Sequence, residues 1–285
     1  MGIPKEKIVL LDGKIVSENE AKISVFDQAI LYGESIFESM RVTKRTPLFL
    51  DLHLQRLEVS AKILGVKIPF TLTEIKNSVL SYLQKTSLSE GFLRMTLTAG
   101  SEDSNGNLFC FLLNKKLPSI ENYEIGVKVK ISDFKKPSLE NFPSNIKSGN
   151  YLNSTLARRE AQEDGFYETI LLDTKGRIAE CANSNIFFFK KNVLVTPSLT
   201  HSPILNGITR KVALNLAKQF KITASERVIL PNEIPNFDEC FLTNSFVGVL
   251  PISEIKNEFS KPVGGMTKLL LESYEALIQE EVSKK

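Results

Sequence analysis

The alternation of apolar and polar residues predicts that the chain begins with a β-hairpin. In KIVLLDGKIV, two short apolar runs flank Asp12-Gly13. This dipeptide tolerates the positive φ angles that a two-residue hairpin turn requires. The run IFESMRV at residues 36–42 is the next predicted strand.

Apolar residues then recur at helical spacing in the segment DLHLQRLEVSAKILG, where three leucines and an alanine fall on one helix face. Asp51 is the expected N-cap, and Gly65 is expected just past the helix end. A second helix is expected from Thr71, because TLTE is a capping box closed by Glu74. Strands at 92–98 and 108–114 complete an α+β unit with two helices on one sheet.

These elements predict two domains joined by a short connection. The first is a small N-terminal domain at residues 1–117. The polar stretch KKLPSIENY shows no periodicity, and we place an interdomain linker at 118–124. The remaining residues, 125–285, are expected to form a larger domain.

The second half consists of short predicted strands and separate helices. The strands are VKVKIS, ETILLD, NIFFF and VLVTP, with others near 222–230, 239–244 and 247–252; the helices run from Asn153 to Asp164, from Ile208 to Phe220 and through MTKLLLESYEALIQEE. The strands do not alternate with helices, and neither a GxGxxG nor a Walker sequence is present. The pattern therefore argues against a Rossmann or P-loop enzyme.

Composition narrows the class of protein. The 285 residues are 42% hydrophobic and 24% charged, as in an ordinary globular protein. The net charge of +3 comes from basic residues that are spread along the chain, which argues against nucleic-acid binding. Three distant cysteines and two histidines show no metal-ligand spacing. Because no secretory leader or membrane-spanning run is evident, we expect a cytoplasmic enzyme without a metal site.

The segment SPILNGITRKVALNLAKQF contains the first candidate site. Ile208 and Thr209 follow a glycine at a helix start, where unpaired backbone N–H groups, a hydroxyl and the helix dipole together can bind an anion such as phosphate. Most helix starts bind only water, so this feature alone also fits a plain turn.

Three further segments have polar residues in positions that allow chemistry. Lys147 lies in IKSGNYLN, where a desolvated amine could attack a carbonyl as a Schiff-base nucleophile, although most lysines are simply solvated. Glu180 ends a short strand, where it could pair with a ring nitrogen or face solvent. In FLTNSF, Ser245 belongs either to a turn or to a second set of phosphate donors.

Taken together, the order and spacing of these segments resemble the class IV aminotransferases. This is the fold-type IV family of pyridoxal 5′-phosphate (PLP) enzymes, which includes branched-chain aminotransferases, D-amino-acid aminotransferases and 4-amino-4-deoxychorismate lyases. The resemblance extends from LLDGKIV and LYGESIFESMRV through HLQRL to the TNS strand. It implies a two-domain α+β fold, in which the larger domain is a pseudo-barrel of short strands with flanking helices.

The resemblance also implies roles for individual residues. Lys147 would bind PLP as a Schiff base and move the substrate proton, and Glu180 would keep the pyridine nitrogen protonated. Arg56, the amides of Ile208 and Thr209, the Thr209 hydroxyl and Ser245 would bind the phosphate. Tyr32 and Phe37 resemble pocket-lining positions. The substrates would be an amino acid and a 2-oxo acid, and the family implies a homodimer.

Departures from the family pattern leave the reaction open. IKSGNY is one residue shorter than the KxGGNY of branched-chain enzymes, which counts against a standard member of that branch. The RG and RxH trap of D-amino-acid enzymes is missing, so Arg41 and Arg94 are the candidates for binding a substrate carboxylate. FES and FLTNSFVGVLPI look more like the lyases, whereas GITR is closer to the transaminases. An aminotransferase is the principal hypothesis, the lyase is the alternative, and a non-enzymatic PLP-binding protein is a remote one.

Overall fold

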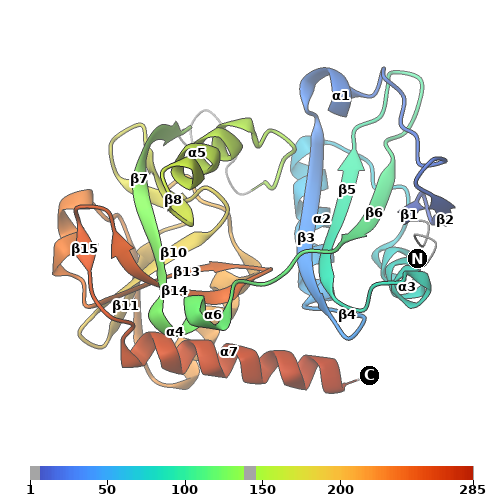
Figure 1. Cartoon of the computed structure of the whole chain (residues 1–285). Coiled ribbons are helices and arrows are strands. Elements are labelled where there is room, and N and C mark those ends of the chain that lie inside the picture. Colours follow the sequence, from blue (N-terminus) through green and yellow to red (C-terminus); the bar gives the residue numbers. More distant parts are fainter. Residues whose placement is uncertain (1–6, 138–145, 285) are drawn as a thin grey trace. The chain divides into compact units, whose positions relative to one another are not determined.

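The computed structural model describes residues 7–137 and 146–284, and the chain divides into two compact units. The first unit comprises Met1–Lys116, Ile146–Asn150 and Glu280–Lys285. The second comprises Leu117–Asn145 and Tyr151–Gln279. Both units are shown in Figure 1. Within this grouping, the segment that contains Lys147 belongs to the first unit, whereas the sequence placed it in the larger domain.

The first unit is built on an antiparallel six-stranded sheet in the order β2-β1-β6-β5-β3-β4. Its strands are β1 (Ile8–Leu11), β2 (Lys14–Ser17), β3 (Ser35–Thr43), β4 (Thr46–Pro47), β5 (Gly91–Thr98) and β6 (Leu108–Leu113). The expected hairpin is confirmed: Leu11 pairs with Lys14 across Asp12-Gly13, and both turn residues have positive φ. The expected strands at 36–42, 92–98 and 108–114 are also confirmed.

Two of the helices in this unit cover the sheet, as the leucine spacing predicted. They are α2 (Leu50–Leu64) and α3 (Leu72–Lys85), and the short helix α1 (Gln28–Tyr32) precedes β3. The capping box of Thr71 and Glu74 is confirmed. The expected N-cap Asp51 is wrong, because α2 begins after Phe49, which adopts a left-handed conformation without a side-chain cap, and Asp51 lies in the first turn.

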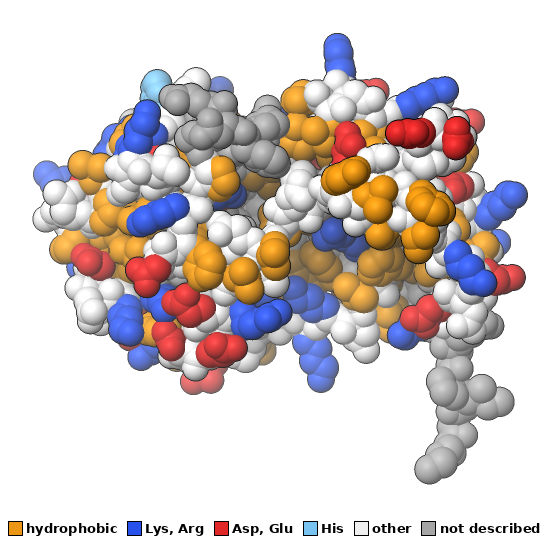
Figure 2. Space-filling model, turned by 90° about the horizontal axis from the view of Figure 1, so that it is seen from above, with side chains coloured by type: hydrophobic (Ala, Val, Ile, Leu, Met, Phe, Trp, Pro, Cys, Tyr) orange, Lys and Arg blue, Asp and Glu red, His pale blue; other side chains and the backbone are white. Residues whose placement is uncertain are grey.

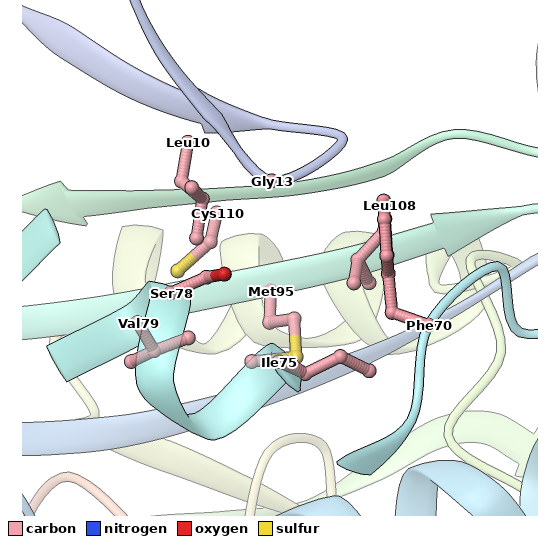
Figure 3. Close-up of a pocket in the computed structure, with 9 residues that line it drawn as sticks. All are labelled: Leu10, Gly13, Phe70, Ile75, Ser78, Val79, Met95, Leu108 and Cys110. Carbon is pink, nitrogen blue, oxygen red and sulfur yellow. The ribbon is translucent and has the colours of Figure 1, made fainter. Parts of the chain in front are cut away.

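The core of the first unit is closely packed. It contains a small apolar cavity of about 10 Å³ beneath the Asp12-Gly13 turn (Figure 3). The cavity is lined by Leu10, Gly13, Phe70, Ile75, Ser78, Val79, Met95, Leu108 and Cys110. This volume holds at most about one water molecule, and an apolar lining of this kind stays dry. The cavity is therefore a packing feature and is far too small for a substrate or a cofactor.

The second unit contains a nine-stranded mixed sheet in which most strands follow the order β12-β11-β10-β13-β14-β7-β8-β9, with β15 paired to β14. The strands are β7 (Val127–Lys136), β8 (Glu168–Asp173), β9 (Ile178–Cys181), β10 (Asn185–Lys190), β11 (Val193–Pro197), β12 (Thr223–Arg227), β13 (Glu239–Asn244), β14 (Gly248–Ile255) and β15 (Phe259–Ser260). Stacked phenylalanine rings, including Phe187 on Phe241 at 4.9 Å, fill part of its core.

The helices of the second unit are α4 (Ile120–Ile125), α5 (Leu152–Glu163), α6 (Ile208–Gln219) and α7 (Gly265–Ser283) up to Gln279, with a 3-10 helix at Pro231–Asn236. The segment 118–124, expected to be a linker, contains most of α4, which has a capping box of Ser119 and Asn122. Sequence reasoning missed this helix because six residues are too few to show a period. In the described ranges 7–137 and 146–284, no helix meets the length and hydropathy needed to cross a membrane.

Candidate active site

In the first unit, the backbone of Lys147 and Ser148 lies against β3. The Lys147 carbonyl accepts a hydrogen bond from the Phe37 amide at 2.8 Å, and Ser148 forms a bridge with Ile36. The Lys147 Nζ lies 4.4 Å from the centre of the Phe37 ring. The segments LYGESIF and IKSGN are therefore neighbours, as a shared site requires.

Two glycines allow this close approach. A Cβ on Gly149 would lie 2.2 Å from the Ser35 hydroxyl, and a Cβ on Gly33 would lie 2.2 Å from Asn150 Oδ1. Gly33 also has a φ of 73°, which other residues rarely adopt. The glycines in both motifs are thus required by packing around the Lys147 segment.

Phe37 also contacts Arg94, one of the two arginines that the sequence suggested for binding a substrate carboxylate. The Arg94 guanidinium carbon lies 3.3 Å from the centre of the Phe37 ring, so the ring contacts two cationic side chains. Arg41 lies on the same face of the sheet and donates from Nε to Thr43 Oγ1 at 3.1 Å. Tyr32 lies on α1 with 74% of its surface exposed. The structure therefore brings Phe37, Arg94 and Lys147 into contact.

Arg56, on α2, binds Glu38, which points to the buried face of β3, the face opposite to Phe37. The two residues form a network with His53. The Arg56 Nε and Nη2 donate to the two oxygens of Glu38 at 2.7 and 2.6 Å. His53 Nδ1 lies 2.6 Å from Glu38 Oε2. Burial alone would raise the pKa of Glu38, but the adjoining Arg56 and His53 lower it to about 2. Glu38 is therefore ionised and fixes the Arg56 guanidinium from one side.

Burial lowers the pKa of His53, so this side chain is neutral at pH 7 and its Nδ1 donates to Glu38. Its Nε2 finds no hydrogen-bond partner in the described part of the chain. The sequence assigned His53 to structure but missed Glu38. Alternation along β3, which places Glu38 on the same face as Ile36 and Met40, is the signal that could have found it.

In the second unit, Glu180 lies on β9 with 5% of its surface exposed. Its Oε2 accepts hydrogen bonds from Asn185 Nδ2 and from the Leu205 amide, each at 3.0 Å. Its Oε1 accepts one from Lys136 Nζ. The alternative in which Glu180 faces solvent is therefore wrong.

The start of α6 lies beside the same cluster. Gly207 is the N-cap and offers no side chain to the first amides of the helix. The Thr209 hydroxyl is buried and has no hydrogen-bond partner among the described residues. A Cβ on Gly207 would lie 2.1 Å from Asn185 Oδ1. The helix start is thus a glycine-lined cradle with an orphaned donor, as a bound anion would require.

Asn185 joins these parts of the second unit, although sequence reasoning assigned it no role. Its amide group contacts Glu180, its oxygen lies beside Gly207, and its backbone pairs with Thr243 on β13. The turn after Thr243 is made by Asn244, whose Oδ1 accepts from the amides of Phe246 and Val247 at 2.9 Å. Ser245, half-buried, lies in this turn. Glu180, the α6 start and the TNS turn are therefore brought together.

The comparison with family models identifies the chain. Residues 35–255 match the model described as amino-transferase class IV. The chain belongs to the class IV aminotransferases. This family consists of PLP enzymes, and the recognised motifs and the observed mixed fold of two units agree with it.

Named relatives cover nearly the whole chain. A protein of Methanocaldococcus jannaschii, provisionally named a branched-chain-amino-acid aminotransferase, is 34% identical over 93% of this chain and 94% of its own length. The branched-chain-amino-acid aminotransferase of Pseudomonas aeruginosa is 30% identical over 88% of this chain and 85% of its own. Both the family model and these named relatives therefore show that the chain is an aminotransferase.

Solved structures show the same fold. The branched-chain amino acid aminotransferase of Escherichia coli superposes with a TM-score of 0.90 at 27% identity, covering 96% of this chain and 95% of its own. The branched-chain aminotransferase of the archaeon Thermoproteus uzoniensis, solved with norvaline, gives 0.89 at 27% identity and covers 98% and 97%. The 4-amino-4-deoxychorismate lyase of P. aeruginosa gives 0.83 at 24% identity, covers 94% and 98%, and supports the fold alone.

Proposed function

We propose that the chain transfers amino groups between an aliphatic, branched-chain amino acid and a 2-oxo acid, and that PLP is its cofactor. The observation that supports this most directly is the cluster around Asn185 in the second unit. It combines a buried glutamate, Glu180, with a helix start that has an orphaned hydroxyl, Thr209. A protonated ring nitrogen and a phosphate are the two ends of PLP, so the residues fit the group.

The proposed roles follow from the chemistry of each side chain. Bound PLP supplies an electron-withdrawing ring that stabilises negative charge at the substrate Cα. Glu180 keeps the ring nitrogen protonated, and the amides of Ile208 and Thr209 with the Thr209 and Ser245 hydroxyls bind the phosphate. Arg56 adds a positive charge whose orientation Glu38 fixes.

Lys147 is proposed to attach the cofactor and to move the proton at the substrate Cα. Its backbone is fixed by the bonds to β3, while its amine lies at the face of Phe37. Phe37 offers an apolar surface to an aliphatic side chain, and Tyr32 is proposed to line the same pocket. Arg94, which stacks on Phe37, is proposed to bind a substrate carboxylate, with Arg41 as the neighbouring candidate.

Branched-chain substrates are favoured over the alternatives by the named relatives, although IKSGNY is one residue shorter than the motif of that branch. The lyase alternative rests on a structural neighbour below 25% identity, which bears on the fold alone. A non-enzymatic PLP-binding protein would have no need for a buried glutamate such as Glu180, which is oriented by hydrogen bonds to both oxygens and keeps acceptor capacity for a ring nitrogen.

A homodimer is part of the proposal. Val25, Phe26, Ile30, Leu31 and Tyr32, on and before α1, are each at least half exposed. Apolar side chains on the surface of the unit that contains α1 are visible in Figure 2. A concentration of this kind is typical of a protein interface. Light scattering during gel filtration should give twice the mass of 31.9 kDa. The cytoplasmic location stays a prediction from the sequence.

The test of the proposed function is a substrate panel on protein reconstituted with PLP. Leucine, isoleucine and valine are offered with 2-oxoglutarate or pyruvate as acceptor, beside D-alanine and beside a pyruvate-release assay on aminodeoxychorismate. We expect absorbance above 400 nm that is bleached by the branched-chain donors, and formation of their 2-oxo acids. Pyruvate release with no transamination would identify the lyase, and a protein that takes up no PLP would contradict the proposal.

A further inference from the structure

The carboxylate of Glu180 has a cationic neighbour that the family resemblance did not suggest. Lys136 Nζ donates to Glu180 Oε1, whereas the other oxygen, Oε2, receives two neutral donors, Asn185 Nδ2 and the Leu205 amide. The side chain of Lys136 is only 18% exposed, and that of Glu180 is 7% exposed. The ion pair is therefore largely removed from solvent.

The geometry of β7 explains why Lys136 reaches Glu180. β7 runs parallel to β8, and its register shifts between Ile131 and Lys135. After this irregularity Lys136 pairs with Asp173, and Leu171 on the other edge of β8 pairs with Glu180. Lys135, one residue earlier, is exposed. The irregular register selects which of the two adjacent lysines enters the site.

Lys136 remains a cation in this position. Burial alone would lower its pKa, but the Glu180 carboxylate raises it above its ordinary value. Tyr151 also interacts with Lys136, and the neighbouring Cys181 thiol has a pKa raised by burial and stays neutral. Lys136 therefore supplies the positive charge in contact with Glu180.

We propose that Lys136 is a positioning residue that sets how strongly Glu180 holds the proton on the ring nitrogen of the cofactor. This inference rests on the proposed function, in which Glu180 contacts that nitrogen. One carboxylate would then face two cations, Lys136 and the protonated ring. A neighbouring charge shifts a titration by about 1 to 3 pH units, and a like charge disfavours the charged form. Lys136 thus makes the ring proton easier to lose and moderates the electron-withdrawing strength of the ring.

The alternative is that the pair merely ties β7 to β9. Orientation of Glu180 does not require Lys136, because the two neutral donors hold Oε2 independently. Removal of the charge at Lys136 should therefore change the electrostatics of the site more than its geometry. The two explanations differ in what happens to the ring nitrogen, and a spectroscopic measurement separates them.

The experiment uses the holoenzyme loaded with PLP that is labelled with ¹⁵N in the ring. The ¹⁵N chemical shift reports protonation and is followed against pH for wild type, Lys136→Gln, Lys136→Arg and Lys135→Gln. Lys136→Gln removes the charge and keeps a hydrogen-bond donor. We expect it to retain the ring proton to a pH about 1 to 3 units higher than wild type. Lys136→Arg should behave like wild type, and so should the exposed, matched control Lys135→Gln.

An unchanged or lower titration in Lys136→Gln would overturn the inference. Should Lys136→Gln fail to fold, Lys136→Met serves as the second neutral variant with the same expected shift. The variant Glu180→Gln distinguishes a failure of the inference from a failure of the proposed function. If Glu180→Gln leaves the ring ¹⁵N signal unchanged, Glu180 does not contact the ring nitrogen, and the proposed function fails together with the inference. If Glu180→Gln changes the signal and the neutral Lys136 variants do not, only the inference is wrong.

Discussion

Each of the two compact units contains a buried glutamate and a lysine with a proposed role, but the roles of the two residue types are exchanged. In the first unit Glu38 is enclosed by Arg56 and His53, while Lys147 lies against an aromatic ring. In the second unit Glu180 lies beside a helix start with an orphaned hydroxyl, and Lys136 is bound to it. The surroundings, rather than the residue type, separate the reacting group from the supporting one.

The difference follows from what each charged atom contacts. Lys136 is held as a cation by Glu180, so its amine is a poor nucleophile. Glu38 makes charge-assisted hydrogen bonds with side chains of its own unit through both oxygens. We therefore expect substitutions of Lys147 and Glu180 to affect turnover, and substitutions of Glu38 to affect folding.

The largest expected effect is on the two lysines. Lys147→Ala should abolish turnover, because no other residue is proposed to attach the cofactor or to move the substrate proton, yet the variant should still bind PLP weakly through the phosphate donors. Lys136→Gln should keep measurable turnover. Steady-state kinetics with a branched-chain donor checks both variants, and the exposed Lys135→Ala serves as the control. Full loss of turnover in Lys136→Gln, with turnover retained in Lys147→Ala, would show that Lys136 rather than Lys147 attaches the cofactor.

The next largest effect compares the two glutamates. Glu180→Gln should lower kcat by about 10²- to 10³-fold, as the loss of one aligned electrostatic group typically does, because an amide does not stabilise a positive ring nitrogen. Glu180→Gln also leaves Lys136 without its counter-ion, so a modest loss of stability accompanies the loss of turnover. Glu38→Gln should lower stability more, because Arg56 is the less exposed of the two cations, and should lower kcat less. Thermal melts and kcat on the same two variants test the contrast, which fails if Glu38→Gln lowers kcat more than Glu180→Gln does.

Acid should affect the first unit through Glu38. Its pKa is lowered from 4.5 to about 2 by Arg56 and His53 against the opposing effect of burial. The stabilisation is present above pH 4.5 and is lost as the pH falls toward 2, and it amounts to roughly 3 kcal/mol. Denaturant unfolding between pH 6 and 2 should show this loss in wild type and a smaller one in Glu38→Gln. Equal slopes in the two proteins would rule out Glu38 as the source.

The smallest expected effects concern the phosphate. Arg56→Ala removes a full charge, and a charge-assisted hydrogen bond contributes about 1.5 to 3 kcal/mol, so PLP affinity should fall by about one to two powers of ten. Ser245→Ala removes one neutral donor and should cost about 1 kcal/mol. Titration of the folded apo-variants with PLP measures both. A larger loss in Ser245→Ala would show that the phosphate site is wrongly assigned.

Much of the fold could be predicted because its signals are local. Asp12-Gly13 and the Thr71–Glu74 capping box each specify a turn or a cap through neighbouring residues alone. The prediction that Asp51 is the N-cap of α2 was wrong, because Phe49 adopts a left-handed conformation and precedes the helix without a side-chain cap. A good capping residue nearby does not reveal such a backbone choice.

The site residues also divide into those with a local sequence signal and those without one. Thr209 and Glu180 belong to family motifs and were predicted as candidates from the sequence. Lys136 was missed because its position depends on a register shift in β7, which no short pattern encodes. Asn185 was missed because most of its contacts, with Leu205, with Gly207 before α6 and with Thr243 on β13, come from residues that are distant in the sequence.

Lys147, and no other lysine, is proposed to attach the cofactor. The most direct test is borohydride reduction of the PLP-loaded protein, followed by proteolysis and mass mapping of the pyridoxyl-labelled peptide. We expect one stoichiometric label on Lys147 and its disappearance in Lys147→Ala. A label on Lys136 or on any other lysine of the wild-type protein would show that Lys147 does not attach the cofactor.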